Sequence, residues 1–122
     1  MKKLIVTLAL LSLAPAVFGG DTLRISAAKL YKAYDRDEAA ADKKYKDKEV
    51  IVSGTVDKID KDVLGNSYVR LRVKDSFGVQ CNFASADVEQ VAQIRLKKHA
   101  RITGKVQGWL GNVILTDCAF VK

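Results

Sequence analysis

The chain has 122 residues, a formal net charge of +7, 48% apolar residues and 29% charged residues. This length favours one domain, and this balance is typical of a globular protein. The longest apolar run lies at the N-terminus and is shorter than the roughly 20 residues that a membrane-spanning helix needs. These properties exclude a multi-domain enzyme, a polytopic membrane protein and a coiled coil, and they indicate a small basic domain.

Residues 1–19 have the three-part pattern of a secretory signal peptide. Two lysines precede an apolar stretch over residues 4–13, and small residues follow it. We expect cleavage after Gly19, with cleavage after Ala16 as the alternative. An uncleaved anchor is disfavoured because the apolar stretch is short. A lipoprotein is disfavoured because no cysteine for lipid attachment lies directly after the apolar stretch. We therefore expect a periplasmic or secreted protein without a transmembrane anchor, with 103 residues and a charge of +5.

Two cysteines, Cys81 and Cys118, belong to the mature chain. An even pair in an oxidising compartment is more often bridged than free, so we predict a disulfide between them, with two buried thiols as the alternative. Closing a loop of this length stabilises a protein by roughly 3–4 kcal/mol in the chain-entropy model. Two cysteines and the single histidine, His99, do not make a four-ligand metal site. We expect no cofactor and no metal.

A helical segment is expected first in the mature chain. Ser26 can cap a helix, with Ile25 and Leu30 in position for a hydrophobic staple. The apolar spacing over residues 27–46 predicts one interrupted helix or two short helices, with a break at residues 35–38. The basic run that follows is interpreted as a solvated helix end rather than as an anion site.

Strand patterns begin at residue 49. Residues 49–59 are rich in β-branched side chains, and Gly54 indicates a bulge or bend in a long strand. Turn residues follow around Gly65. Residues 67–75 then alternate between apolar and polar side chains, and residues 77–83 continue this pattern. On the strand over residues 77–83 we expect four inward side chains, namely Phe77, Val79, Cys81 and Phe83.

The remaining elements are a helix and two strands. Ser85 is expected to cap a helix over residues 85–96, and strands are expected over residues 100–108 and 112–121, joined by a short turn that begins at Trp109. The order β-β-β-α-β-β predicts a five-stranded OB-fold barrel. We expect a helical segment over residues 20–47 and the barrel over residues 48–122. The third and fifth strands close such a barrel and carry the two cysteines, so a disulfide across this seam is plausible.

The chain also resembles the tRNA_anti-like family of bacterial OB-fold proteins. The resemblance is carried by ISAAKLYKAY, AADKKYKDKEVIVSGTVDKIDKD, LGNSYVRL, FGVQCNF and GWLGNVILTDC, which together cover most of the mature chain. The family name refers to similarity with the anticodon-binding domain of tRNA synthetases, and many members carry export signals. The resemblance implies the fold and transfers no site residue, because a fold does not by itself define a function.

Catalytic motifs are not found in the sequence. The nucleophile elbow, the phosphate-binding glycine loop and paired histidines at metal spacing are missing, so we expect no enzyme activity. Asp57, Asp60 and Asp62 cluster near a turn, but their spacing is not that of an EF-hand. We interpret them as a solvated acidic loop rather than as a calcium site.

The outward face of the second strand is the candidate ligand site. Cations and aromatic rings at period two suit single-stranded nucleic acid, and this face is the usual ligand face of an OB-fold. Trp109 is interpreted either as a second stacking surface or as an anchor that closes the barrel end. The candidate residues on the two strands are Tyr68, Arg70, Arg72, Lys74, Gln80 and Asn82.

Two classes of function remain open for this face. Alternating charge also keeps exposed strands from pairing with other chains, and a charge of +5 is moderate. We therefore favour an exported binding module of the bacterial envelope without enzyme activity, whose partner is an envelope protein, a glycan or another anionic ligand. The alternative is a binder of single-stranded nucleic acid or another polyanion through the basic face.

Overall fold

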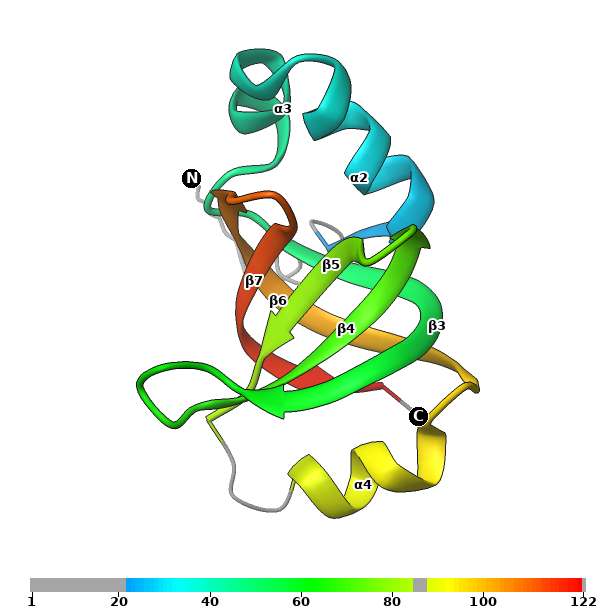
Figure 1. Ribbon diagram of the computed structural model, residues 1–122. Coiled ribbons are helices and arrows are strands. Elements are labelled where there is room, and N and C mark those ends of the chain that lie inside the picture. The colour runs from blue at the N-terminus through cyan, green and yellow to red at the C-terminus, as the bar shows by residue number, and fades with distance from the viewer. Residues whose placement is uncertain (1–21, 85–87, 122) are drawn as a thin grey trace, which may run out of the picture.

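The computed structural model describes residues 22–84 and 88–121 (Figure 1). The predicted signal peptide and the predicted Ser85 cap lie outside these ranges. The described elements are, in chain order, β2 (Leu23–Ser26), α2 (Ala27–Arg36), α3 (Glu38–Tyr45), β3 (Glu49–Lys61), β4 (Ser67–Lys74), β5 (Phe77–Asn82), α4 (Val88–Arg95), β6 (His99–Trp109) and β7 (Val113–Phe120).

Strands β3 to β7 form a closed barrel. The sheet order is β2-β3-β4-β5-β7-β6, and β3 also pairs with β6, which closes the sheet on itself. The pairing between β5 and β7 is parallel and short, and it runs from Val79 opposite Val113 to Cys81 opposite Leu115. Helix α4 lies in sequence between the third and fourth barrel strands. The predicted β-β-β-α-β-β order and the OB-fold are therefore confirmed.

Alternation of side chains builds the core. Val50, Val52 and Val56 on β3 are fully buried, as are Val69 and Leu71 on β4. Because successive strand residues point to opposite sides, the residues between them face outward. Burying a side chain of this size stabilises the fold by about 1.5–3 kcal/mol, so the register of each strand is strongly determined.

Two short helices close one end of the barrel. The Ser26 hydroxyl accepts a hydrogen bond from the Lys29 N–H at 3.1 Å, and the Asp37 carboxylate accepts one from the Ala40 N–H at 3.1 Å. These caps start α2 and α3 separately, so the predicted interruption is confirmed. Helix α2 contacts β2, β3, β4, β5 and β7, with Leu30 and Tyr34 buried. Helix α4 lies at the opposite end of the barrel (Figure 1).

Strand β2 was missed by the sequence analysis. It runs parallel to β3, with Leu23 opposite Val50 and Ser26 opposite Ser53. Four residues with one buried side chain, Ile25, give too short a pattern for recognition. The strand fixes the start of α2 against the barrel.

Two predicted details of the strands differ in the structure. Gly54 was predicted to mark a bulge or a bend, but the bulge of β3 lies between Val56 and Lys58, so the bulge at Gly54 was wrong and the bend stays a prediction. Gly54 instead allows a close approach, because a Cβ atom there would lie 3.0 Å from the Cβ of Ala27. Phe77 was expected to point inward, but 46% of it is exposed, since a register shift between Arg72 and Lys74 precedes it.

Candidate functional site

The candidate residues of β4 and β5 lie on one outer surface of the barrel. Tyr68 is opposite Asn82, and Arg70 is opposite Gln80, so these four side chains form two neighbouring cross-strand pairs. Arg72 continues the row opposite Gly78 and is exposed. We call these outward residues of the two strands the β4–β5 face: Tyr68, Arg70, Arg72, Gln80 and Asn82. Lys74 is exposed beyond the register shift at the end of β4.

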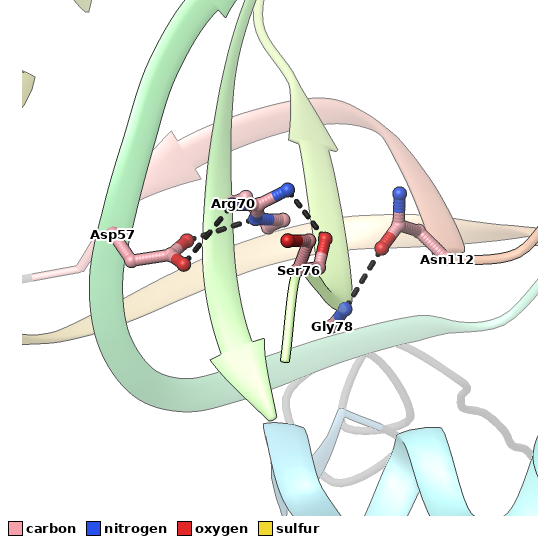
Figure 2. A network of polar contacts seen from close by, with 5 residues as sticks. All are labelled: Asp57, Arg70, Ser76, Gly78 and Asn112. Atoms are coloured by element: carbon pink, nitrogen blue, oxygen red, sulfur yellow. Dashed lines mark hydrogen bonds and ion pairs between the residues drawn. The ribbon is translucent and has the colours of Figure 1, made fainter. Parts of the chain in front are cut away.

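Arg70 is held by an acidic neighbour. Its Nε and Nη2 atoms donate to the two carboxylate oxygens of Asp57 at 2.9 and 3.0 Å, and its Nη1 atom donates to the Ser76 carbonyl (Figure 2). The bond to Asp57 raises the pKa of Arg70, against the effect of partial burial. Such a two-pronged pair neutralises the charge and fixes the side chain. Arg70 therefore contributes little net positive charge to the face.

The bulge in β3 explains why Asp57 reaches Arg70. The register passes from Val56 opposite Leu71 to Lys58 opposite Arg70, so Asp57 is the extra residue between them. A bulge of this kind redirects a side chain. The same strand places Asp60 opposite Tyr68. The first strand of the barrel thus adds carboxylates beside the predicted basic face.

The polar side chains on β5 also contact each other. The Gln80 Nε2 atom donates to Asn82 Oδ1 at 3.0 Å. Near the start of β5, the Gly78 N–H donates to Asn112 Oδ1 at 2.8 Å, which ties the strand to the turn before β7 (Figure 2). The face therefore offers amides, one tyrosine, the paired charges of Arg70 and Asp57, and the exposed Arg72.

Exposed apolar side chains frame the β4–β5 face at both ends. Val63 is fully exposed and Leu64 is 82% exposed in the turn between β3 and β4. At the other end, Leu110 is 83% exposed, and Phe77 lies beside Gly111 of the same turn. We call Val63, Leu64, Phe77 and Leu110 the apolar tips. The sequence analysis missed them, although two adjacent apolar residues in a turn rich in polar residues were a usable signal.

The aspartates around the β3–β4 turn have structural contacts. Asp57 binds Arg70, and Asp60 accepts a hydrogen bond from the Lys61 N–H at 2.8 Å. Asp62 accepts hydrogen bonds from the Leu64 and Asn66 N–H groups at 2.9 Å each, which organises the turn. Among the residues that the structure describes, no group of three or more metal-ligating side chains comes together.

Trp109 packs against the N-terminal helices. Its ring lies 6.1 Å from the Tyr34 ring in a stacked arrangement and 5.2 Å from the Tyr31 ring. It is the last residue of β6 rather than part of a loop. This packing agrees with the anchor interpretation, and a role of Trp109 as a second stacking surface stays a prediction. The Tyr34 hydroxyl donates to Asp42 Oδ1 at 2.8 Å, and burial raises the pKa of Tyr34.

Surface hollows accompany these elements in the described part of the chain. A hollow of about 280 Å³ lies between α3 and the end of β6 and includes Trp109 and Leu110. A hollow of about 320 Å³ is lined by Asp47, Glu49, Lys105 and Asp117. A third, of about 220 Å³, is lined by Asn66, Asn82, Phe83, Ala84, Thr116 and Asp117. The third borders the β4–β5 face through Asn82.

The two cysteines are neighbours in the core. Both are buried thiols, and the predicted disulfide is not formed in the structure. Burial raises the pKa of Cys81 well above its usual value, and the contact with Cys118 raises it further. Gly104 makes room for this pair, because a Cβ atom there would lie 2.6 Å from Cys118 Sγ. The bridge itself stays a prediction.

Within the described ranges, the helices are too short and too polar to cross a membrane. The comparison with curated protein sequences gives no match. Among solved structures, the chain is similar to a Klebsiella pneumoniae protein described as a "putative nucleic acid-binding lipoprotein". The TM-score is 0.67 at 24% identity, and the match covers 85% of this chain and 95% of the other. At this identity the similarity supports the fold.

The family comparison covers nearly the whole chain. The model of the tRNA_anti-like family matches residues 6–119. This range includes every described strand of the barrel except the last residue of β7. The match agrees with the strand order and with the resemblance seen in the sequence, so the chain belongs to the tRNA_anti-like family of OB-fold proteins.

Proposed function

We propose that this protein is an exported binding module without enzyme activity, and that it holds a protein partner in the bacterial envelope on the β4–β5 face. The observation that carries the proposal is the neutralised arginine at the centre of the face. Arg70 bonds to Asp57 and to Ser76, so it is already satisfied within the fold. A surface with a paired central charge and half-buried amide groups suits a partner that brings its own polar and apolar groups.

The apolar tips support a protein partner. Large exposed apolar groups on both sides of a polar surface are typical of interaction sites. Protein interfaces combine apolar and aromatic contacts with about one hydrogen bond per 100–200 Å². Val63 and Leu64 supply such contacts at one end, and Phe77 and Leu110 supply them at the other. Gln80 and Asn82 supply donors and acceptors between them.

Export is supported by two observations. Residues 1–19 have the pattern of a secretory signal peptide. The structural neighbour is described as a lipoprotein, a class of envelope protein. A lipoprotein carries a lipid-attachment cysteine directly after the apolar stretch, and residues 14–20 of this chain contain none. We therefore propose a periplasmic or secreted protein.

Site-specific photo-cross-linking in cells that produce the full chain tests the proposed face. A photo-reactive residue at Gln80 lies on the β4–β5 face, and one at Thr103 lies on the outer side of β6 as the control. We expect a discrete protein adduct from position 80, none from position 103, and loss of the adduct in the Leu64→Asp, Leu110→Asp variant. Equal adducts from both positions, or an adduct that survives this variant, would contradict the proposal.

Single-stranded nucleic acid is the second candidate ligand. The structural neighbour's description names nucleic acid, and Tyr68, Arg72 and Lys74 offer one ring and two cations. Labelled single-stranded oligonucleotide and sulfated glycan, each titrated at low and near-physiological salt, separate the candidates. We expect weak binding that disappears with salt for both ligands. Tight oligonucleotide binding that persists at the higher salt would make nucleic acid the ligand.

The readout for this titration should not be the emission of Trp109. That ring packs on Tyr31 and Tyr34 at the helical end of the barrel, so its emission reports on the contact between helix and barrel. A label on the oligonucleotide reports on binding wherever it occurs. Charge reversal at Arg72 then tests whether the oligonucleotide uses the β4–β5 face.

A further inference from the structure

The hollow of about 280 Å³ lies at the helical end of the barrel, where α3 contacts β6 (Figure 1). We call it the α3–β6 hollow. Its volume lies just below the roughly 300–1,000 Å³ of pockets for drug-sized ligands, so it suits a small molecule or a single side chain. Its lining includes Glu38, Asp42, Lys46, Trp109, Leu110 and Ile114.

Aromatic and aliphatic side chains form part of this lining. Trp109 and Ile114 are half-buried, and Leu110 is exposed. The Trp109 ring is held in place, because its centroid lies 6.1 Å from that of the stacked Tyr34 ring and 5.2 Å from that of the Tyr31 ring. The face of an indole ring attracts cations. The hollow therefore offers a fixed aromatic and apolar surface on which a ligand can pack.

Two carboxylates of α3 line the same hollow. Glu38 and Asp42 are four positions apart, which places them on the same side of a helix. Asp42 Oδ1 accepts a hydrogen bond from the Tyr34 hydroxyl at 2.8 Å, so this carboxylate is fixed next to the aromatic cluster. An ionised carboxylate has about four acceptor positions, and this bond uses one of them. Acceptor capacity for a ligand therefore remains at the Asp42 carboxylate.

The negative potential of these carboxylates is visible at Tyr34. Burial raises the pKa of Tyr34, the hydrogen bond to Asp42 and the charge of Asp42 raise it further, and the charges of Glu38 and Asp47 add smaller effects. Each of these charges opposes the formation of a tyrosinate anion. The same potential favours a cation beside Asp42.

Lys46 supplies a positive charge among the described lining residues. It lies at the C-cap of α3 and is exposed, and its N–H donates to the Asp42 carbonyl at 3.0 Å. An exposed ammonium group leaves a carboxylate easily, because exposed ion pairs contribute little to stability. A ligand cation would therefore compete with Lys46 for the two carboxylates.

We propose that the α3–β6 hollow binds a ligand that carries a guanidinium or ammonium group on an apolar stem. The cation binds Glu38 and Asp42, and the stem packs on Trp109 and Ile114. Free small amines share this chemistry with the arginine and lysine side chains of a peptide. The proposal goes beyond the proposed function, because it assigns a ligand class to a hollow at the helical end of the barrel.

Titration of the purified protein with n-butylguanidine tests the proposal, with the emission of Trp109 as the readout. Trp109 is the single tryptophan of the chain and lines the hollow, so its emission responds to occupancy. The neutral isostere n-butylurea is the ligand control. We expect a saturable change with n-butylguanidine that weakens with salt, and no change with n-butylurea at the same concentrations.

Charge variants identify the groups that bind the cation. Glu38→Gln should weaken binding about fivefold, the upper range for an exposed ion pair, and the Glu38→Gln, Asp42→Asn variant should weaken it more. Lys46→Gln should strengthen binding about twofold, because it removes the competing charge. Glu38 and Lys46 are exposed, so these two variants should keep the fold, which circular dichroism checks.

Asp35→Asn is the matched control. Asp35 is an exposed carboxylate of α2 and is not among the described residues that line the hollow. Its neutralisation changes the charge of the protein as Glu38→Gln does. Binding of n-butylguanidine should therefore change less than twofold.

A short peptide separates the two sources of this chemistry. An acetylated and amidated tripeptide with arginine between two glycines presents the guanidinium group on a side chain, and citrulline in place of arginine gives the neutral control. Tighter binding of the peptide than of n-butylguanidine would support the proposal with a partner's side chain as the ligand. Tighter binding of n-butylguanidine would support it with a free small ligand.

Three outcomes would overturn the proposal. If neither guanidinium probe causes a saturable change, the hollow does not bind this group. Equal binding of n-butylurea would show that the charge is not recognised. Equal losses in Glu38→Gln and Asp35→Asn would show a general effect of protein charge. These outcomes leave the cross-linking test of the β4–β5 face unaffected, because the variants lie on the helices.

Discussion

The β4–β5 face and the outer side of β3 and β6 lie next to each other, with Arg72 at their border opposite Thr55. On the β4–β5 face, the bulge of β3 places Asp57 against Arg70. On the outer side of β3 and β6, the same strand presents Ser53 and Thr55, opposite Arg101 and His99. Net charge along one strand is therefore a poor guide to a binding surface, because a neighbouring strand decides whether each cation is neutralised.

The largest expected effect on stability is at Gly78, which lies opposite Arg72 where the two surfaces meet. A Cβ atom there would collide with the Leu71 carbonyl, which belongs to the neighbouring backbone. Gly78→Ala should lower the free energy of unfolding by about 3 kcal/mol, measured by urea denaturation. Gly65→Ala is the control: its φ is +85° in open space, so it should cost about 1 kcal/mol. Equal costs would show that the β4–β5 pairing adjusts easily.

Strand β5 of the β4–β5 face pairs along its other edge with β7. The cysteine pair lies at this seam, with Cys81 on β5 and Cys118 on β7. If the predicted bridge forms in the oxidised protein, Cys81→Ser and Cys118→Ser should each lower stability by about 3 kcal/mol. The double variant should add little more, because both changes remove the same bond. Additive losses, or two titratable thiols in the unfolded, non-reduced protein, would contradict the bridge.

Two arginines on one strand test the comparison most directly. Arg70→Gln should lower the free energy of unfolding by about 1 kcal/mol, because it breaks a partly buried, two-pronged pair with Asp57. Arg72→Gln should change stability by less than about 0.5 kcal/mol, because that side chain is exposed. Chemical denaturation measures both values. Equal effects would mean that the ion pair does not distinguish the two surfaces.

Asp57→Asn provides the reciprocal variant. It leaves the Arg70 charge without its carboxylate, so anion binding to the β4–β5 face at low salt should increase. The slope of log affinity against log salt should steepen by about one for an oligonucleotide. If the oligonucleotide does not bind more tightly to this variant, then the Arg70 side chain is not directed towards solvent when the Asp57 charge is removed.

A further expected effect is a pH dependence from Cys81 in the reduced protein. Burial raises its pKa in the folded state, so the fold favours the neutral thiol. Stability is therefore full below the usual thiol pKa of about 8.5 and falls as the pH rises above it. Urea denaturation should show a loss of about 1 kcal/mol between pH 7.5 and 9.5. Cys81→Ala should reduce this loss, whereas an unchanged loss would assign it to other groups.

Local patterns were enough to predict most of the fold. The Ser26 cap, the interruption at Asp37 and the alternation along β4 each depend on a few adjacent residues. The position of the β3 bulge could not be predicted, because Gly54 and Asp57 both permit one and packing against α2 and β4 decides between them. Phe77 was placed inward because the alternation was continued across a register shift that leaves no mark in the sequence.

The candidate site was predicted in part. The outward pairing of Tyr68, Arg70, Gln80 and Asn82 follows from period two and from the hairpin between β4 and β5. The pairing of Arg70 with Asp57, 13 positions away in the chain, depends on the bulge register. The outward row of Arg72, Thr55 and His99 joins β4 to β6 through β3, so no local window of the sequence contains it.

The sequence by itself determined the strand order, the helix caps and the side of each strand that faces the core, because these follow from short-range spacing and apolar burial. The tertiary structure decided which charges meet. Electrostatic pairing depends on contacts between strands over a few ångströms, and a single inserted residue changes those contacts. For this protein, that physical difference separates two arginines of the same strand, Arg70 paired with Asp57 and Arg72 exposed.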